Sequence, residues 1–62
     1  MFKTIIKYGN SIHEYTNRTE KAAFRQHYPA FNYRMGEYYG QVSGDFRIID
    51  TKTGKVVFNE RF

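Results

Sequence analysis

The chain has 62 residues and no cysteine, and its ten lysines and arginines against six aspartates and glutamates give a net charge of +4. This length predicts a single domain, and the missing cysteines exclude a disulfide framework, a cysteine-ligated zinc site and a thiol nucleophile. The positive charge favours an anionic partner, whether nucleic acid, an acidic protein surface or a lipid headgroup.

No apolar run approaches the ~20 residues of a membrane span. The start of the chain, MFKTIIKYGN, does not resemble a secretory signal because Lys7 interrupts its short apolar stretch. A cysteine-free chain without such signals fits a reducing cytoplasm, and we expect no membrane partner. A domain this small has a marginal core, so a homodimer is a further expectation.

The first two elements predict a β-hairpin. Residues 2–8 alternate and are rich in aromatic and branched side chains, and Gly9-Asn10 separates them from a second strand-like run, SIHEY. Gly-Asn between two such runs is typical of a two-residue turn, which pairs Tyr8 with Ser11. The more apolar face should point to the core, and it carries Phe2, Thr4, Ile6, Tyr8, His13 and Tyr15.

The middle of the chain predicts one amphipathic helix over residues 18–28. Asn17 and Glu20 have the spacing of an N-cap and its N3 partner, and Pro29 disfavours helical geometry at the residue before it. The helical period places one set of side chains toward the core, namely Ala23, Phe24, His27 and Tyr28. The opposite face is basic and carries Arg18, Lys21 and Arg25.

Residues 32–62 predict a three-stranded meander, with strands at roughly 33–42, at 45–50 and after Gly54. Ser43-Gly44 forms the first turn signal, and the segment TKTG at 51–54 forms the second. A bulge at Gly54 would place Asp50 opposite Val56 and Ile48 opposite Phe58. That register puts Phe46, Ile48, Val56 and Phe58 on one face.

Together these elements predict a small single domain over residues 1–62 of class α+β, in the order ββαβββ. Its antiparallel sheet combines the N-terminal hairpin with the C-terminal meander, and one helix packs on one face. The predicted core is Phe2, Ile6, Tyr8, Ala23, Phe24, Tyr28, Phe31, Met35, Tyr39, Phe46, Ile48, Val56 and Phe58.

Catalytic and metal-binding patterns are incomplete in this sequence. The pair Gly54-Lys55 lacks the earlier glycine and the following helix of a phosphate-binding loop. The only histidines, His13 and His27, match no zinc spacing, and the two serines have no nucleophile motif around them. We therefore expect a protein that is not an enzyme and that carries no cofactor and no metal.

A surface for binding a partner is expected on the sheet. One helix covers only one face, and a monomer seldom leaves a large apolar patch on the other face in water. Tyrosine and arginine are also the residues enriched at interface hot spots. The predicted partner-binding residues are Arg34, Tyr38, Arg47, Ile49, Val57 and Arg61.

The alternative is a basic DNA- or RNA-binding module. In that hypothesis the helix residues Arg18, Lys21 and Arg25 contact phosphates, while tyrosines next to arginines stack on bases. The small size, the single compact domain and the absence of catalytic equipment also resemble the small modulators encoded by phages and mobile elements. That resemblance implies a viral protein that occupies the surface of a host protein.

The leading hypothesis is therefore a small non-enzymatic binding protein in the cytoplasm of the producing or host cell. It would regulate or inhibit a macromolecular partner by protein–protein contact through the apolar, tyrosine- and arginine-bearing face of its sheet.

Overall fold

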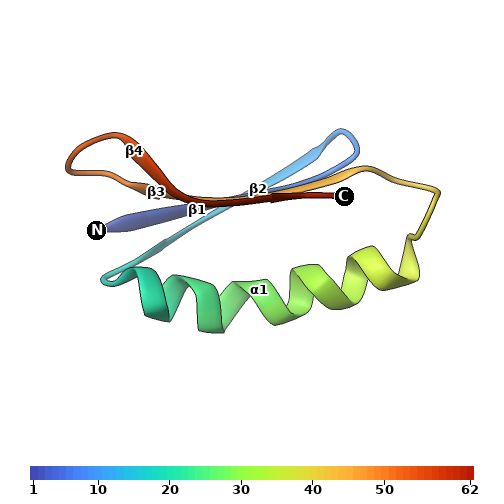
Figure 1. Cartoon of the computed structure of the whole chain (residues 1–62), viewed down its shortest axis with the longest axis horizontal. Helices are drawn as coiled ribbons and strands as arrows, with labels where there is room; N and C mark the ends of the chain where they lie inside the picture. Colours follow the sequence, from blue (N-terminus) through green and yellow to red (C-terminus); the bar gives the residue numbers. More distant parts are fainter.

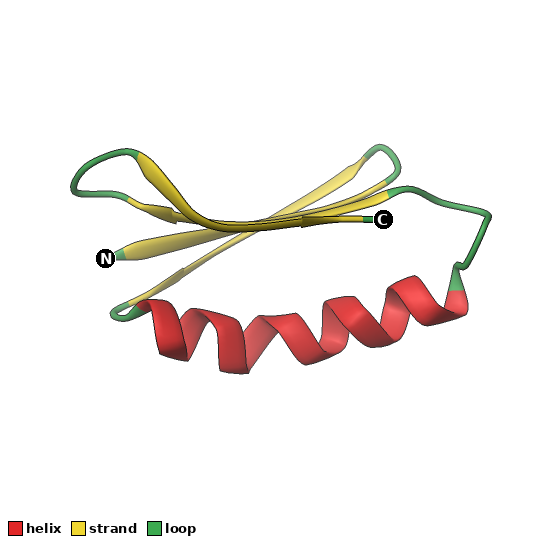
Figure 2. Cartoon of the chain, in the orientation of Figure 1, coloured by secondary structure: helices red, strands yellow, loops and turns green.

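One antiparallel sheet and one helix make up the computed structural model, which describes all 62 residues (Figure 1). The elements in chain order are β1 (Phe2–Tyr8), β2 (Ser11–Asn17), α1 (Glu20–Glu37), β3 (Gly44–Asp50) and β4 (Lys55–Arg61). The strands lie in the order β2-β1-β3-β4, and α1 crosses beneath one face of the sheet (Figure 2). The α+β class and the single helix on one face of an antiparallel sheet are thus confirmed.

The N-terminal hairpin forms in the predicted register. Gly9 has a φ of 58°, the left-handed geometry that a tight turn requires, and Tyr8 pairs with Ser11. The other edge of β1 pairs with β3, so that Ile6 lies opposite Phe46. Because β1 is antiparallel to both neighbours, β2 and β3 run in the same direction, and α1 is the crossover between them.

The predicted strand over 33–42 is wrong, and the element order is ββαββ instead of ββαβββ. The helix continues through Pro29 to Glu37, and a loop over 38–43 leads into β3. Along the helix Ala23, Phe31 and Met35 are buried, with at most 2% of each exposed. Residues four apart lie on one face of a helix, so this burial offsets the cost of the internal proline.

The start of the helix also differs from the prediction. Thr19, not Asn17, is the N-cap, and its side-chain oxygen accepts a hydrogen bond of 3.1 Å from the backbone N–H of Ala22. Asn17 is the last residue of β2, where its side chain bonds to Gln26 and His27 of the helix instead. The capping-box spacing therefore identified the right region but the wrong cap.

The core lies between α1 and the two central strands. Its buried hydrophobic side chains are Ile6, Ala23, Phe31, Met35, Phe46 and Ile48. Phe31 and Phe46 meet at 5.3 Å between ring centroids, which joins the helix to β3. Met35 packs directly over Gly44, where an added Cβ would overlap its sulfur, so only glycine allows this close approach.

The C-terminal hairpin has its bulge at a different residue from the one predicted. Gly54 has the expected positive φ of 75°, and Ile48 pairs with Phe58 as predicted. Asp50, however, faces Lys55, because the register shifts between Ile48 and Ile49. This shift makes Val57 the extra residue of β4.

Three members of the predicted core lie outside it, namely Val56, Tyr39 and Phe24, and Phe24 is 36% exposed. Val56 is 47% exposed, and Tyr39, in the loop after the helix, is 86% exposed. Val57 is partly buried and packs against the core cluster in place of Val56. A one-residue shift of a bulge exchanges the faces of neighbouring side chains, which accounts for the Val56 and Val57 reversal.

Candidate binding surfaces

The face of the sheet turned away from α1 is uncovered, and it carries one apolar residue from each strand. These residues are Ile12 of β2, Ile5 of β1, Ile49 of β3 and Val56 of β4, and together they are called the diagonal band below. Ile49 pairs directly with Val56, while Ile5 is diagonal to both Ile49 and Ile12 in the strand register. Diagonal neighbours in a sheet lie roughly 7–8 Å apart, so the four side chains form one line across all four strands.

Charged residues flank the diagonal band unequally. On one side, Lys3 and Glu14 form an ion pair of 3.0 Å and leave no net charge. On the other side, Lys7 pairs with Ile12 of β2 and with Asp45 of β3. Asp45 in turn pairs with Arg61 of β4, so the three charged residues form one row across the strands. Asp45 pairs at 3.3 Å with Arg47 of its own strand. Lys7 and Arg61 take part in neither of the two ion pairs in the structure, so this flank is positive.

The structure brings only part of the predicted partner-binding set together. Arg47, Ile49 and Arg61 share the uncovered face, as the strand register requires. Val57 does not lie with them, because the bulge turns Val56 outward instead. The exposed Val56 is therefore the residue that the sequence reasoning missed, and only the position of the bulge could have indicated it.

Arg34 and Tyr38 lie on the helix side of the sheet, apart from the other predicted residues. Arg34 is in the last turn of α1, and its guanidinium carbon is 5.4 Å from the centre of the Tyr8 ring. Tyr38 caps the helix and packs edge-on against the same ring, with 6.4 Å between centroids. Both were misplaced because the predicted strand over 33–42 is helix and loop.

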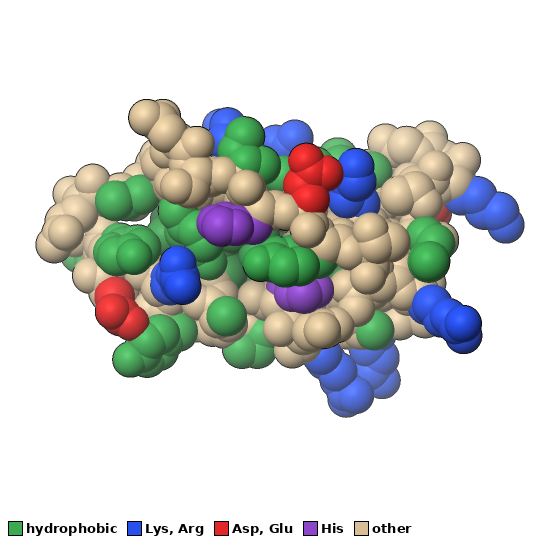
Figure 3. Space-filling model, turned by 180° about the vertical axis from the view of Figure 1, so that it is seen from behind, with side chains coloured by type: hydrophobic (Ala, Val, Ile, Leu, Met, Phe, Trp, Pro, Cys, Tyr) green, Lys and Arg blue, Asp and Glu red, His purple; other side chains and the backbone are tan.

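A groove runs between the edge strand β2 and the helix on this side. Its cavity of about 140 Å³ is lined by Ile6, Tyr8, His13, Tyr15, Gln26, His27, Ala30 and Arg34. Figure 3 shows the two histidine side chains on one face of the molecule, with green hydrophobic and tyrosine side chains around them. No carboxylate lines the cavity.

One wall of the groove is a stack of Tyr15 on His27, with 4.2 Å between ring centroids. Asn17 donates its amide hydrogen to Gln26 at 2.6 Å, so its oxygen is left to accept a hydrogen bond from Nε2 of His27 at 3.1 Å. Burial lowers the pKa of His27 below its usual value of 6.5, which favours the neutral ring. These bonds fix β2 to the helix.

The predicted nucleic-acid-binding residues occupy the helix start. Lys21 and Arg25 are exposed on α1 beside Phe24, and Arg18 is exposed in the short connection that precedes the helix. Glu20 lines the same shallow depression, so the positive charge there is partly offset. Further along the chain Tyr33 is 71% exposed, which leaves an aromatic ring free on the helix.

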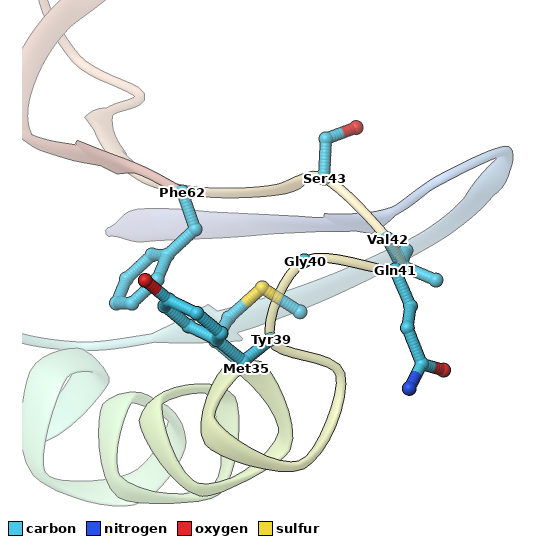
Figure 4. Close-up of a pocket in the computed structure, with 7 residues that line it drawn as sticks. All are labelled: Met35, Tyr39, Gly40, Gln41, Val42, Ser43 and Phe62. Atoms are coloured by element: carbon cyan, nitrogen blue, oxygen red, sulfur yellow. The ribbon is translucent and has the colours of Figure 1, made fainter.

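Another pocket lies where the end of the helix approaches the end of the sheet. It measures about 430 Å³ and is lined by Met35, Tyr39, Gly40, Gln41, Val42, Ser43 and Phe62. Met35, Tyr39 and Phe62 direct their side chains toward this space, whereas Gln41 and Ser43 point away from it (Figure 4). A ligand site ordinarily adds a few convergent polar groups to such an apolar lining.

His13 and His27 are not joined by a third ligand: the structure contains no group of three or more histidine, aspartate or glutamate side chains that could hold a metal ion. The single helix does not combine the length and apolar character needed to cross a membrane. No family model, curated protein or solved structure matches the chain. A functional proposal therefore rests on the geometry of the uncovered sheet face and of the helix surface.

Proposed function

We propose that the protein is a small non-enzymatic binding protein that docks on a macromolecular partner through the uncovered face of its sheet. The observation that supports this proposal is the diagonal band, which places Ile5, Ile12, Ile49 and Val56 in one line on a face that no element covers. Ile12 and Val56 are 57% and 47% exposed. Burying apolar area of this kind on a partner gains about 25 cal/mol for each Å².

The charges beside the band define the chemistry of the partner. Lys7, Arg47 and Arg61 lie on one flank with a single carboxylate, Asp45, among them. A complementary protein surface has an apolar ridge with aspartate or glutamate side chains along one side. Such complementarity steers association and fixes the orientation of the bound partner. By occupying that ridge, the protein would regulate or inhibit its partner, as the small modulators of phages and mobile elements do.

Two double variants test this surface. Ile12→Glu with Val56→Glu places a carboxylate at each end of the diagonal band, where both side chains are largely exposed. The matched control is Tyr33→Glu with Tyr39→Glu, which changes the charge equally at positions 71% and 86% exposed on the helix side. Both proteins should remain folded, because none of the four side chains belongs to the core cluster.

The assay is affinity capture from a nuclease-treated native lysate, with captured proteins quantified for each variant. The proposal expects at least a tenfold loss of the captured partner for the band variant and less than a twofold change for the control, because a buried unpaired carboxylate is costly at an interface. Equal capture by both variants, with unchanged circular dichroism, would contradict the assignment of this face.

A second copy of the chain is one candidate occupant of the same face, which makes a homodimer part of the proposal. A core of six buried hydrophobic side chains is small, and dimerisation is one way in which small domains gain stability. Light scattering at millimolar concentration distinguishes a homodimer from a monomer that binds another protein, since only self-association doubles the mass of 7.4 kDa.

Nucleic-acid binding is the second candidate function, and the exposed side chains of the helix favour it. Lys21 and Arg25 form no ion pair, and the Tyr33 ring is free to stack on a base. This function requires affinity for a single-stranded oligonucleotide that falls steeply with salt and weakens in Lys21→Gln with Arg25→Gln. A flat salt response would exclude it.

A further inference from the structure

We propose that the groove between β2 and α1 binds a small oxyanion, namely a phosphate group, through Arg34, His13 and Tyr8. This site lies on the helix side of the sheet and is independent of the diagonal band. The groove combines a cavity, an arginine outside any ion pair and several polar side chains without side-chain hydrogen bonds.

Arg34 is the principal charge in the groove. Its guanidinium lies over the Tyr8 ring at 5.4 Å, and it belongs to neither of the two ion pairs in the structure. The nearest carboxylate along the helix, that of Glu37, neither pairs with it nor lines the cavity. A guanidinium offers several N–H donors in a planar fork, which matches the oxygens of phosphate better than a lysine does.

The neighbouring polar side chains have unused hydrogen-bonding capacity. His13 and the hydroxyl groups of Tyr8 and Tyr15 make no side-chain hydrogen bond in the structure, although all three residues line the cavity. The Tyr8 ring lies 6.0 Å from the His13 ring and also contacts Arg34, so both side chains adjoin the same ring at the cavity. Nε2 of His27 is already hydrogen-bonded to Asn17, and the His27 ring forms one wall of the groove.

The cavity is small and partly open to solvent. Its volume of about 140 Å³ is the smallest among the four pockets of the structure. A phosphate group can enter it, and the remainder of a phosphate monoester can extend into solvent. The phosphate can therefore come from the free ion or from the terminal group of a monoester, and the test has an arm for each.

The experiment is a titration followed by the ring signals of the two histidines in NMR spectra. Inorganic phosphate and adenosine monophosphate are the two probes, and sodium chloride at equal ionic strength is the control. We expect saturable shifts of the His13 signals with phosphate and none with chloride. Tighter binding of the monophosphate identifies the monoester as the source, and equal or weaker binding identifies the free ion. Shifts that fail to saturate, or that chloride reproduces, would overturn the proposal.

Arg34→Gln and Arg25→Gln form a matched pair, because each removes one arginine from the same helix and only Arg34 lines the groove. We expect Arg34→Gln to weaken phosphate binding about tenfold and Arg25→Gln less than twofold, since the loss of a charge-assisted hydrogen bond has that size. Equal weakening would show a general effect of net charge and refute the site. Should Arg34→Gln fail to fold, His13→Gln replaces it, with His27 as the reporter. Wild-type affinity in that variant would equally refute the site.

Discussion

At the scale of single residues, Thr4 stands out because it is fully buried while its hydroxyl has no hydrogen-bond partner. It lies in the centre of β1, with Tyr15 and Ile48 as its cross-strand neighbours. A buried polar group without a partner loses its bonds to water and gains nothing in return. Thr4 therefore weakens the middle of the core, although its branched shape suits a strand.

Replacing Thr4 with valine keeps that shape and removes the hydroxyl. We expect Thr4→Val to stabilise the protein by about 1 kcal/mol, which for a domain of this size raises Tm by roughly 4–8 °C. Thr16→Val is the control, because Thr16 is exposed at the edge strand, and we expect its Tm to change by less than about half as much. Thermal unfolding followed by circular dichroism measures both. A lower Tm for Thr4→Val would mean that the hydroxyl is bonded after all.

Arg34 shows how far a residue could be assigned from sequence alone. The sequence identified it as a binding residue because arginine next to tyrosine is typical of interfaces. The structure keeps Arg34 beside a tyrosine, but that tyrosine is Tyr8 of the first strand, 26 positions earlier in the chain. Contacts between distant segments depend on the tertiary fold, so the type of residue was predictable and its surroundings were not.

At the scale of elements, the hairpins were predictable because their signals are local. Gly9-Asn10 allows a two-residue turn and thereby sets the register of β1 and β2. Gly54 likewise indicated the second hairpin, through the positive φ that its turn requires. The bulge at Val57 was not predictable in the same way, because two valines are adjacent there and the one that packs against the core cluster is known only from the tertiary fold.

The helix was the element on which the sequence reasoning failed. Pro29 indicated an end at residue 28, and the glycines and tyrosines that follow are more typical of strands and turns. The apolar spacing from Ala23 through Phe31 to Met35 was the competing signal, and it prevailed because all three side chains are buried. Pro29 itself is exposed, so water can reach the carbonyl of Arg25, which loses its usual donor there.

This explanation predicts that the proline weakens the helix without ending it. An internal proline costs a helix about 3 kcal/mol relative to alanine. Alanine also makes the unfolded chain more flexible, which offsets roughly 1 kcal/mol of the gain in stability. We therefore expect Pro29→Ala to stabilise the protein by about 2 kcal/mol in denaturant unfolding. Asn32→Ala, at another exposed position of α1, should gain less than about 1 kcal/mol. A Pro29→Ala variant no more stable than the wild type would show that the helix ends at Pro29 in solution.

At the scale of the whole molecule, the sheet has one covered and one uncovered face, and the small core follows from that arrangement. Only 8 of 62 residues are buried, and the accessible surface of 4538 Å² exceeds the roughly 4200 Å² typical of a monomer of 7.4 kDa. The sequence predicted the uncovered face from the number of helices. It left the strand order open and misplaced the bulge, and these two features together put Val56 in line with the three isoleucines of that face.

The isoleucines can show whether the uncovered face binds the partner. Ile5, Ile12 and Ile49 lie on that face, whereas Ile6 and Ile48 are buried under α1. The measurement is an NMR spectrum of isoleucine methyl groups, recorded for the protein alone and with the captured partner. We predict that the signals of Ile5, Ile12 and Ile49 shift or broaden while those of Ile6 and Ile48 remain in place. Unchanged signals for the three outer isoleucines in a complex that demonstrably forms would contradict the account.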